Sequence, residues 1–254
     1  MASEDAPLES QGAATAPPAP RRKGRRRLLL LAIVLALGLA HGPILRGMAG
    51  LLVVDEQAGG AAYLWLRPMS DEFREGETPG DRAAAFVHEG NGRRILLVEP
   101  KPGRLVEAGI LPPFEAQELA ELAARRVPQG AVTVLGGKAR DLWEEARLLD
   151  PWLRGNPDAR VVLLASRFRS RCERYVLRAV LGPEEASRIA VAAVADRRYD
   201  ESNWWKSRTG AKEFFAAWVA WAYAWGQGGE HPKPPLWDPD DYERQLRVAA
   251  HQGT

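Results

Sequence analysis

The sequence predicts an α/β fold: a three-layer, Rossmann-like domain with a mostly parallel sheet, preceded by one N-terminal transmembrane helix. Short apolar runs alternate along the chain with amphipathic segments of about ten to fifteen residues, which is the pattern of repeated βαβ units. Residues 161–164 (VVLL) lead into a helical pattern at 169–181, and a buried strand followed at once by a helix is half of such a unit. The third observation is a long apolar run near the N-terminus, next to a basic cluster.

The N-terminal part of the chain predicts a membrane anchor. Residues 28–45 are almost continuously apolar and long enough to span a bilayer, and 28–48 is the predicted transmembrane segment. Residues 1–27 lack periodicity and end in RRKGRRR, so we expect a disordered, cytoplasmic tail. The alternative is a cleaved signal peptide with small residues at 38 and 40. Both interpretations place the rest of the chain outside the cytoplasm, and the first predicts a single-pass inner-membrane protein.

The strands and helices that follow the membrane segment are predicted from apolar patterns and from the Gly, Pro and capping residues that bound them. Residues 51–228 are expected to form the α/β domain, and residues 229–254 an irregular, Pro-rich tail. The predicted strands are short apolar runs, most of them ended by Pro or Gly. They lie at 61–66, 94–98, 131–135, 161–165 and 188–194. The predicted helices repeat apolar residues three or four apart between capping residues and Gly or Pro. They lie at 81–89, 114–126, 141–153, 169–181 and 212–225.

The last predicted helix is rich in aromatic side chains. Phe214, Trp218, Trp221 and Trp225 recur on one face. Such a stripe on a terminal helix is expected to pack in the core. The alternative is a membrane interface, where Trp is enriched, but the other face of this helix lacks the Lys and Arg of interfacial helices.

Composition excludes several classes of protein. The chain of 254 residues has 35 Lys and Arg against 33 Asp and Glu, so it lacks the strong net positive charge that would point to nucleic acid as a partner. The single cysteine, Cys172, excludes an intrachain disulfide. We expect its thiol to be packed and inert, the alternative being a thiol activated by the helix start beside it. No His and Cys cluster has metal-ligand spacing, so neither a metal nor another cofactor is expected.

Basic and small residues follow several of the predicted strands. The expected ligand-binding residues are Arg67, Gly136, Gly137, Arg140, Ser166, Arg167 and Arg169. Because the carboxyl ends of parallel strands meet at one edge of a sheet, these residues are predicted to converge. Arginine suits bidentate contact with phosphate, and glycine lets the backbone approach a ligand. The alternative is that the charged side chains are ordinary solvated loop residues.

Candidates for catalysis are two carboxylates, Glu99 after the second strand and Glu144 at a helix start. Glu144 is placed to act as a general base, and its charge is equally explained by the helix dipole. The sequence shows no nucleophile elbow, so it does not support hydrolysis and leaves open whether any reaction is catalysed.

Three segments match a known family in their order along the chain. Residues 141–146 (DLWEEA) correspond to its helix start, 163–171 (LLASRFRSR) to its strand end, and 204–210 (WWKSRTG) to the segment before its last helix. Together with the membrane segment, they resemble the DUF218 domain family, the SanA/ElyC/YdcF-like bacterial envelope proteins. The resemblance implies a place in envelope biogenesis. This chain departs from the family at Arg169, where the family usually has His, and at Cys172, where it usually has Arg.

The predicted function combines the anchor with the basic rim. We expect a membrane-anchored envelope protein whose extracytoplasmic domain binds or processes a phosphate-bearing envelope precursor, such as a lipid-linked sugar. The expected partners are the lipid bilayer and this precursor, and not nucleic acid. The alternative is a non-catalytic scaffold that assists wall or outer-layer assembly through protein contacts. A deep pocket at the rim favours the first prediction, and a shallow rim favours the second.

Overall fold

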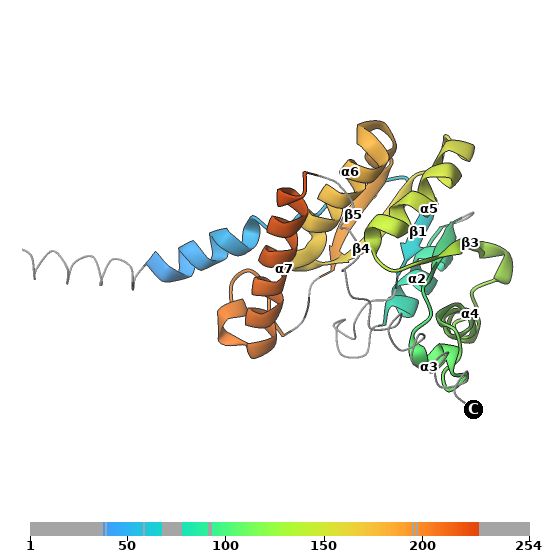
Figure 1. Cartoon of the computed structure of the whole chain (residues 1–254), viewed down its shortest axis with the longest axis horizontal. Helices are drawn as coiled ribbons and strands as arrows, with labels where there is room; N and C mark the ends of the chain where they lie inside the picture. The colour runs from blue at the N-terminus through green and yellow to red at the C-terminus, as the bar shows by residue number, and fades with distance from the viewer. Residues whose placement is uncertain are drawn as a thin grey trace, which may run out of the picture. The chain divides into compact units, whose positions relative to one another are not determined.

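Five parallel strands form the centre of the computed structural model (Figure 1). They are β1 (Tyr63–Leu66), β2 (Arg94–Pro100), β3 (Val132–Ala139), β4 (Val161–Ser166) and β5 (Ile189–Val194). Their order across the sheet is β3-β2-β1-β4-β5, and every neighbouring pair is parallel. The predicted α/β class is confirmed, and the strand order is consistent with a Rossmann-like fold.

The structure describes residues 38, 40–57, 59–67, 78–90, 93–194, 196 and 198–228. The predicted tails at 1–27 and 229–254 lie outside these residues, as do residues 28–37 of the predicted anchor. None of the helices within the described ranges combines the length and the apolar character needed to span a bilayer. The chain divides into two units, 1–43 and 44–254, and everything below concerns the second.

Helices cover both faces of the sheet. The described ones are α2 (Pro79–His88), α3 (Arg104–Glu107), α4 (Phe114–Ala124), α5 (Leu142–Gly155), α6 (Ser170–Ser187) and α7 (Arg208–Gly226). Single 3-10 turns occur at η1 (Gln129–Ala131), η2 (Arg167–Arg169) and η3 (Trp204–Lys206). α2 and α4 pack on one face, and α5 and α6 on the other (Figure 1). The domain therefore has the three layers that the sequence predicts.

Side-chain caps fix where several helices begin. The Thr78 hydroxyl accepts a hydrogen bond from the backbone N–H of Asp81, and the Asp81 carboxylate accepts one from the N–H of Thr78, which forms a capping box on α2. Asp141 caps α5 by accepting from the N–H of Glu144 at 3.0 Å. This last cap matters for the site, because it orients the turn between β3 and α5.

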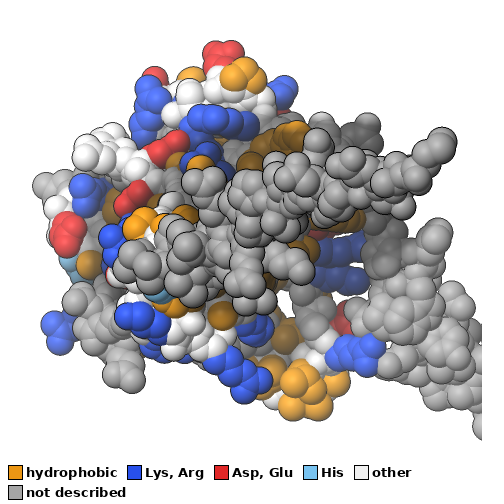
Figure 2. All heavy atoms as spheres, turned by 90° about the vertical axis from the view of Figure 1, so that its left-hand side faces the viewer, with side chains coloured by type: hydrophobic (Ala, Val, Ile, Leu, Met, Phe, Trp, Pro, Cys, Tyr) orange, Lys and Arg blue, Asp and Glu red, His pale blue; other side chains and the backbone are white. Residues whose placement is uncertain are grey.

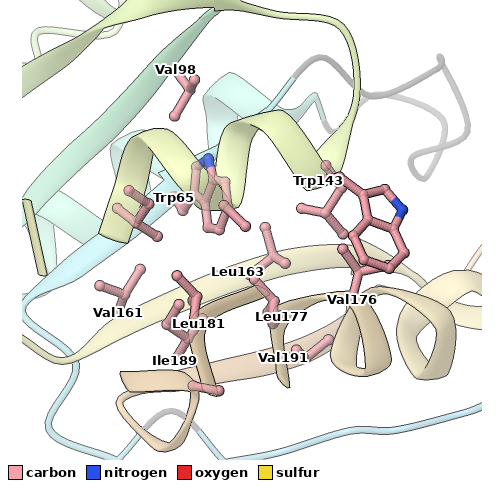
Figure 3. Close-up of a cluster of buried hydrophobic side chains, with 14 of the residues drawn as sticks. Trp65, Val98, Trp143, Val161, Leu163, Val176, Leu177, Leu181, Ile189 and Val191 are labelled. Carbon is pink, nitrogen blue, oxygen red and sulfur yellow. The ribbon is translucent and has the colours of Figure 1, made fainter. Parts of the chain in front are cut away.

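The two faces of the sheet bury alternate residues, as strand geometry requires. Leu64 and Leu97 face α2 and α4, whereas Trp65 and Leu163 face α5 and α6. Figure 3 shows Trp65 and Leu163 beside Leu177 of α6, in the cluster that fills this second layer. These side chains are at most a few per cent exposed. Burial of such side chains stabilises the fold by roughly 1.5–3 kcal/mol each.

A third cluster joins α7 to the start of the domain. It contains Leu52, Phe168 of η2, Trp204 of η3 and Phe214 of α7, and the rings of Trp204 and Phe214 stack with centroids 3.6 Å apart. Helix α7 therefore packs on η2, η3 and α6 through part of its predicted aromatic face. The end of that face is different, because Trp225 is 68% exposed.

The outer edge of β5 is covered by two carboxylates from the segment before β1. Asp55 accepts a hydrogen bond from the N–H of Ala193 at 3.0 Å, and Glu56 accepts one from the N–H of Val191 at 2.9 Å. The N–H of Glu56 in turn donates to the carbonyl of Val191 at 2.8 Å. Acidic side chains on an edge strand satisfy its free donors and block further strand pairing.

Three differences from the prediction concern β3, α3 and α6. β3 continues through Gly136 and Gly137, where the prediction ended it, with a register shift against β2. The short helix α3 has too few residues to produce a periodic pattern and was not predicted. α6 extends past its predicted end at 181, although Gly182, with φ of 79°, interrupts its helical backbone.

Candidate functional site

A cavity of about 410 Å³ opens at the carboxyl ends of β1 and β4. The strand order reverses between these two strands, because β1 to β3 progress toward one edge and β4 and β5 extend the sheet on the other side. Ligands of open α/β sheets bind at this switch point. The lining side chains come from the strand ends and from α5, α6 and α7: Arg67, Arg140, Asp141, Leu142, Trp143, Leu164, Ser166, Arg169, Cys172, Glu173, Val176, Ala220, Tyr223 and Ala224.

Arg67, at the end of β1, is held by two carboxylates. Its Nε donates to Glu145 Oε2 at 2.5 Å, and its Nη1 donates to Glu173 Oε1 at 3.2 Å. The three side chains are 15%, 8% and 13% exposed, respectively. Burial opposes the charge of Arg67, but the carboxylates of Glu173 and Glu145 outweigh it and raise the pKa of the guanidinium. Arg67 is therefore a charged, already compensated group in the wall of the pocket.

Glu173 is incompletely satisfied. Its Oε2 is buried and has no hydrogen-bond partner among the described residues. Burial raises the pKa of this carboxyl, with the opposing charges of Arg67 and Arg169 too weak to cancel the effect and Glu145 adding to it. A carboxyl group in this setting favours its protonated form more than one in water does.

Arg169 is an exposed cation that lines the pocket. It forms no hydrogen bond or ion pair with any residue that the structure describes, although its charge acts on Glu173 and Cys172. It lies at the end of η2, three residues after Ser166, whose side chain also lines the cavity. An uncompensated guanidinium next to a hydroxyl at the switch point is a set of donors suited to phosphate.

The turn before α5 supplies the opposite wall. The backbone N–H of Arg140 donates to Glu144 Oε2 at 2.8 Å, and the Nε of Arg140 lies 3.8 Å from Glu144 Oε1. Glu144 thus closes the turn and is not among the residues that line the cavity. Its predicted role as a base has no geometric support, because its carboxylate is used within the turn.

Apolar side chains make up about half of the lining. Trp143 and Leu142 come from α5, Val176 from α6, and Tyr223 and Ala224 from α7. Figure 3 shows Trp143 packed against Val176 at one end of the buried cluster. A ligand that fits this pocket combines an anionic group with an apolar or sugar-like part.

The structure brings together four of the seven predicted ligand-binding residues: Arg67, Arg140, Ser166 and Arg169. Arg167 instead pairs with Glu201, its Nη2 lying 2.8 Å from Oε1. Gly136 and Gly137 lie within β3 and do not line the cavity. Both arginines lie in the 3-10 turn η2, and its three residues per turn point the side chains of residues 167 and 169 to different sides.

Gly137 has a structural role rather than one at the pocket. Its φ is 116°, and a Cβ atom there would lie 2.5 Å from Cδ2 of Leu148. The glycine therefore lets α5 pack closely on β3. Glu99, the other predicted carboxylate, is half-buried at the end of β2 and is absent from the pocket lining.

The thiol of Cys172 lines the pocket but is not activated. Burial and the charge of Glu173 raise its pKa to about 11, with Arg169 acting in the other direction. The thiolate is the reactive form, so a thiol with this pKa is protonated at neutral pH. The raised pKa agrees with the expectation of an inert cysteine.

The described residues contain no group of three His, Cys, Asp or Glu side chains placed to hold a metal ion. Neither a protein-family model, nor a curated protein, nor a solved structure matches the chain. The resemblance to the DUF218 family stays a prediction.

Sequence reasoning missed Glu145, Glu173 and Tyr223, which complete the site. Glu145 follows Glu144 at the start of α5, and only the fold shows that Glu145 points inward, with 8% of its side chain exposed. Glu173 is four residues after Arg169, which places both on the same side of the start of α6. That spacing was the one feature of the sequence from which a position of Glu173 near Arg169 could have been predicted.

Proposed function

We propose that the domain binds a phosphate-bearing ligand in the pocket between β1 and β4. The observation that carries the proposal is the uncompensated guanidinium of Arg169 at the switch point, beside Ser166 and in a pocket that is half apolar. Arg67 contributes little net charge because Glu145 and Glu173 already pair with it. Arg140 Nε lies 3.8 Å from Glu144 Oε1, so Arg169 is the lining arginine without an ion-pair partner among the described residues.

The pocket favours a ligand with more than a bare phosphate. Trp143 and Tyr223 offer flat surfaces, and aromatic faces of this kind suit a sugar ring or an acyl chain next to the charged group. A phosphorylated envelope precursor, such as a lipid-linked sugar, has this chemistry. The proposal keeps the predicted placement of the domain outside the cytoplasm, behind a membrane anchor.

The scaffold alternative would use surfaces instead of a pocket. Its best candidate is the outer side of α7, where Phe215 and Val219 are more than half exposed. On the described part of the face in Figure 2, basic, acidic and apolar side chains are interspersed, so no single kind of partner is indicated there. The pocket, in contrast, has a defined volume and a specific donor set, which favours ligand binding.

Native mass spectrometry of the full-length chain, extracted in mild detergent, tests the proposal. We expect an additional mass that fragments to a phosphate-containing ion. Arg169→Ala should lose this mass, whereas Arg147→Ala, an exposed α5 arginine outside the pocket lining, should retain it. A ligand-free parent protein that also binds no added phosphorylated sugar would favour the scaffold.

A further inference from the structure

A second cavity, of about 310 Å³, lies between α6, α7 and the segment that follows residue 53. Its lining residues are Val54, Glu56, Arg171, Arg174, Tyr175, Arg178 and Trp221. None of them lines the pocket at the switch point. The sequence predicts no site at these residues.

Three arginines on one face of α6 dominate this second pocket. Arg171, Arg174 and Arg178 are spaced three and four residues apart, which places them side by side. The lining contains one carboxylate, Glu56, so the charges of these side chains sum to about +2. Burial, together with the neighbouring charge of Arg178, lowers the pKa of Arg174 despite the opposing charge of Glu56. Glu56 thus compensates only part of the positive charge of the three arginines.

Glu56 and Arg174 are already fixed by other contacts. Glu56 Oε2 accepts from the N–H of Val191 at 2.9 Å, and Oε1 lies 3.0 Å from Arg174 Nε. Arg174 Nη1 donates to the carbonyls of Ala186 and Ile189 at 2.7 and 2.8 Å. These two side chains form the floor of the pocket. Both oxygens of Glu56 already have partners there, so Glu56 does not pair with Arg171 or Arg178.

One donor in this pocket lacks an acceptor. The Nε atom of Arg171 is buried and makes no hydrogen bond within the described part of the chain, whereas the Nε of Arg174 lies 3.0 Å from Glu56 Oε1. The one side-chain hydrogen bond of Arg171 there is a long one, from Nη2 to the carbonyl of Val53 at 3.4 Å. Buried charged donors without acceptors are costly, and a bound anion would satisfy them.

We propose that this pocket is a second anion site, which takes a phosphate group through Arg171 and Arg178 above the floor formed by Arg174 and Glu56. Planar guanidinium groups bind phosphate oxygens in pairs, and a phosphate dianion matches the charge of the lining. Trp221 and Tyr175 form the walls, next to whatever group the phosphate carries.

A lipid headgroup and a soluble phosphate share this chemistry. Leu45 ends the apolar run within the predicted transmembrane segment, and residues 45–50 are helical. At ~1.5 Å per helical residue and ~3.5 Å per extended residue, Val54 lies within about 22 Å of Leu45. If the run spans a bilayer, the pocket is within reach of its surface. The experiment therefore uses one probe for each source.

Calorimetric titrations of the full-length chain test the proposal, with Arg169→Ala as the background so that the first pocket does not contribute. The probes are inorganic phosphate and dihexanoyl phosphatidylglycerol, which is used below its micellar concentration. We expect at least one to bind, and Arg171→Gln with Arg178→Gln to weaken it tenfold or more. Arg147→Gln, on the surface of α5, is the matched control and should not change the affinity.

Comparing the affinities of the two probes shows whether the bound phosphate group comes from a lipid headgroup or from a soluble molecule. Tighter binding of the short-chain lipid than of inorganic phosphate assigns the site to headgroups, and equal or weaker binding assigns it to soluble phosphate. Arg178→Glu alone, at an exposed position, repeats the test if the double variant does not fold. The proposal is wrong if neither probe binds at millimolar concentration, or if the arginine variants bind as tightly as their background.

Discussion

At the residue scale, the charge available to a ligand depends on which arginines are already paired. Arg67 has two carboxylate partners, Arg167 has Glu201, and Arg169 has none among the described residues. Three arginines that look alike in the sequence thus differ in what they can bind. The sequence identifies their common edge of the sheet, but partners such as Glu145 and Glu201 come from distant positions and are visible only in the fold.

Glu173 gives a prediction about pH. Burial raises its pKa, so its carboxyl is more easily protonated in the folded chain than in the unfolded chain. As pH rises past the ordinary glutamate value of about 4.3, ionisation therefore lowers the stability of the folded state. Glu173→Gln cannot ionise and keeps an oxygen for Arg67.

The melting temperature of Glu173→Gln should therefore exceed that of the parent at pH 8 and approach it at pH 4. Thermal denaturation across this range, followed by circular dichroism, provides the measurement. A difference that stays constant with pH would show that the Glu173 carboxyl is not perturbed.

At the scale of elements, most strands and helices could be predicted because a regular apolar pattern identifies them and Gly or Pro marks where they end. The prediction ended β3 at Gly136 and Gly137, since paired glycines usually mark a turn. The strand instead continues to Ala139, which pairs with Pro100 of β2 beyond a register shift, and Gly137 there has a positive φ beside Leu148 of α5. A contact between distant residues decided that boundary, and no local pattern contains it.

Gly137→Ala should therefore destabilise the fold. The added Cβ would lie 2.5 Å from Leu148 Cδ2, and the backbone would be strained at φ of 116°. Overpacking of this kind costs about 1–3 kcal/mol, which lowers the melting temperature by roughly 2–12 °C in a domain of this size.

Gly136→Ala is the matched control, because its Cβ would meet nothing within 4 Å. Its melting temperature should stay close to that of the parent. Equal losses for both variants would indicate that strand flexibility, and not the contact with Leu148, explains the glycine pair.

At the scale of the whole molecule, the sheet order explains why the rim prediction succeeded in part. A parallel sheet was expected from the alternation of strands and helices, and parallel strands end at one edge. The sequence could not reveal that β4 lies beside β1, since pairing of strands this far apart depends on packing of the complete chain. That pairing creates the pocket and leaves Glu99, at the end of β2, outside its lining.

The topology of the chain in the membrane is a separate prediction. The basic cluster at 21–27 before one apolar run predicts that the C-terminus lies outside the cytoplasm. A periplasmic-type reporter, such as alkaline phosphatase, fused after Thr254 should be active. Activity of a cytoplasmic reporter at the same position, with an inactive alkaline phosphatase fusion, would overturn the prediction.

The central claim is that Arg169 binds the phosphate of a ligand at the switch point. Its most direct test is a calorimetric titration with a phosphorylated sugar such as glucose 1-phosphate. The full-length chain would carry Arg171→Gln and Arg178→Gln, so that the second pocket does not contribute. Arg169→Ala should weaken binding by about 1.5–3 kcal/mol, and Arg169→Lys should recover part of the loss because it keeps the charge but not the planar fork. Unchanged affinity in Arg169→Ala would contradict the site assignment.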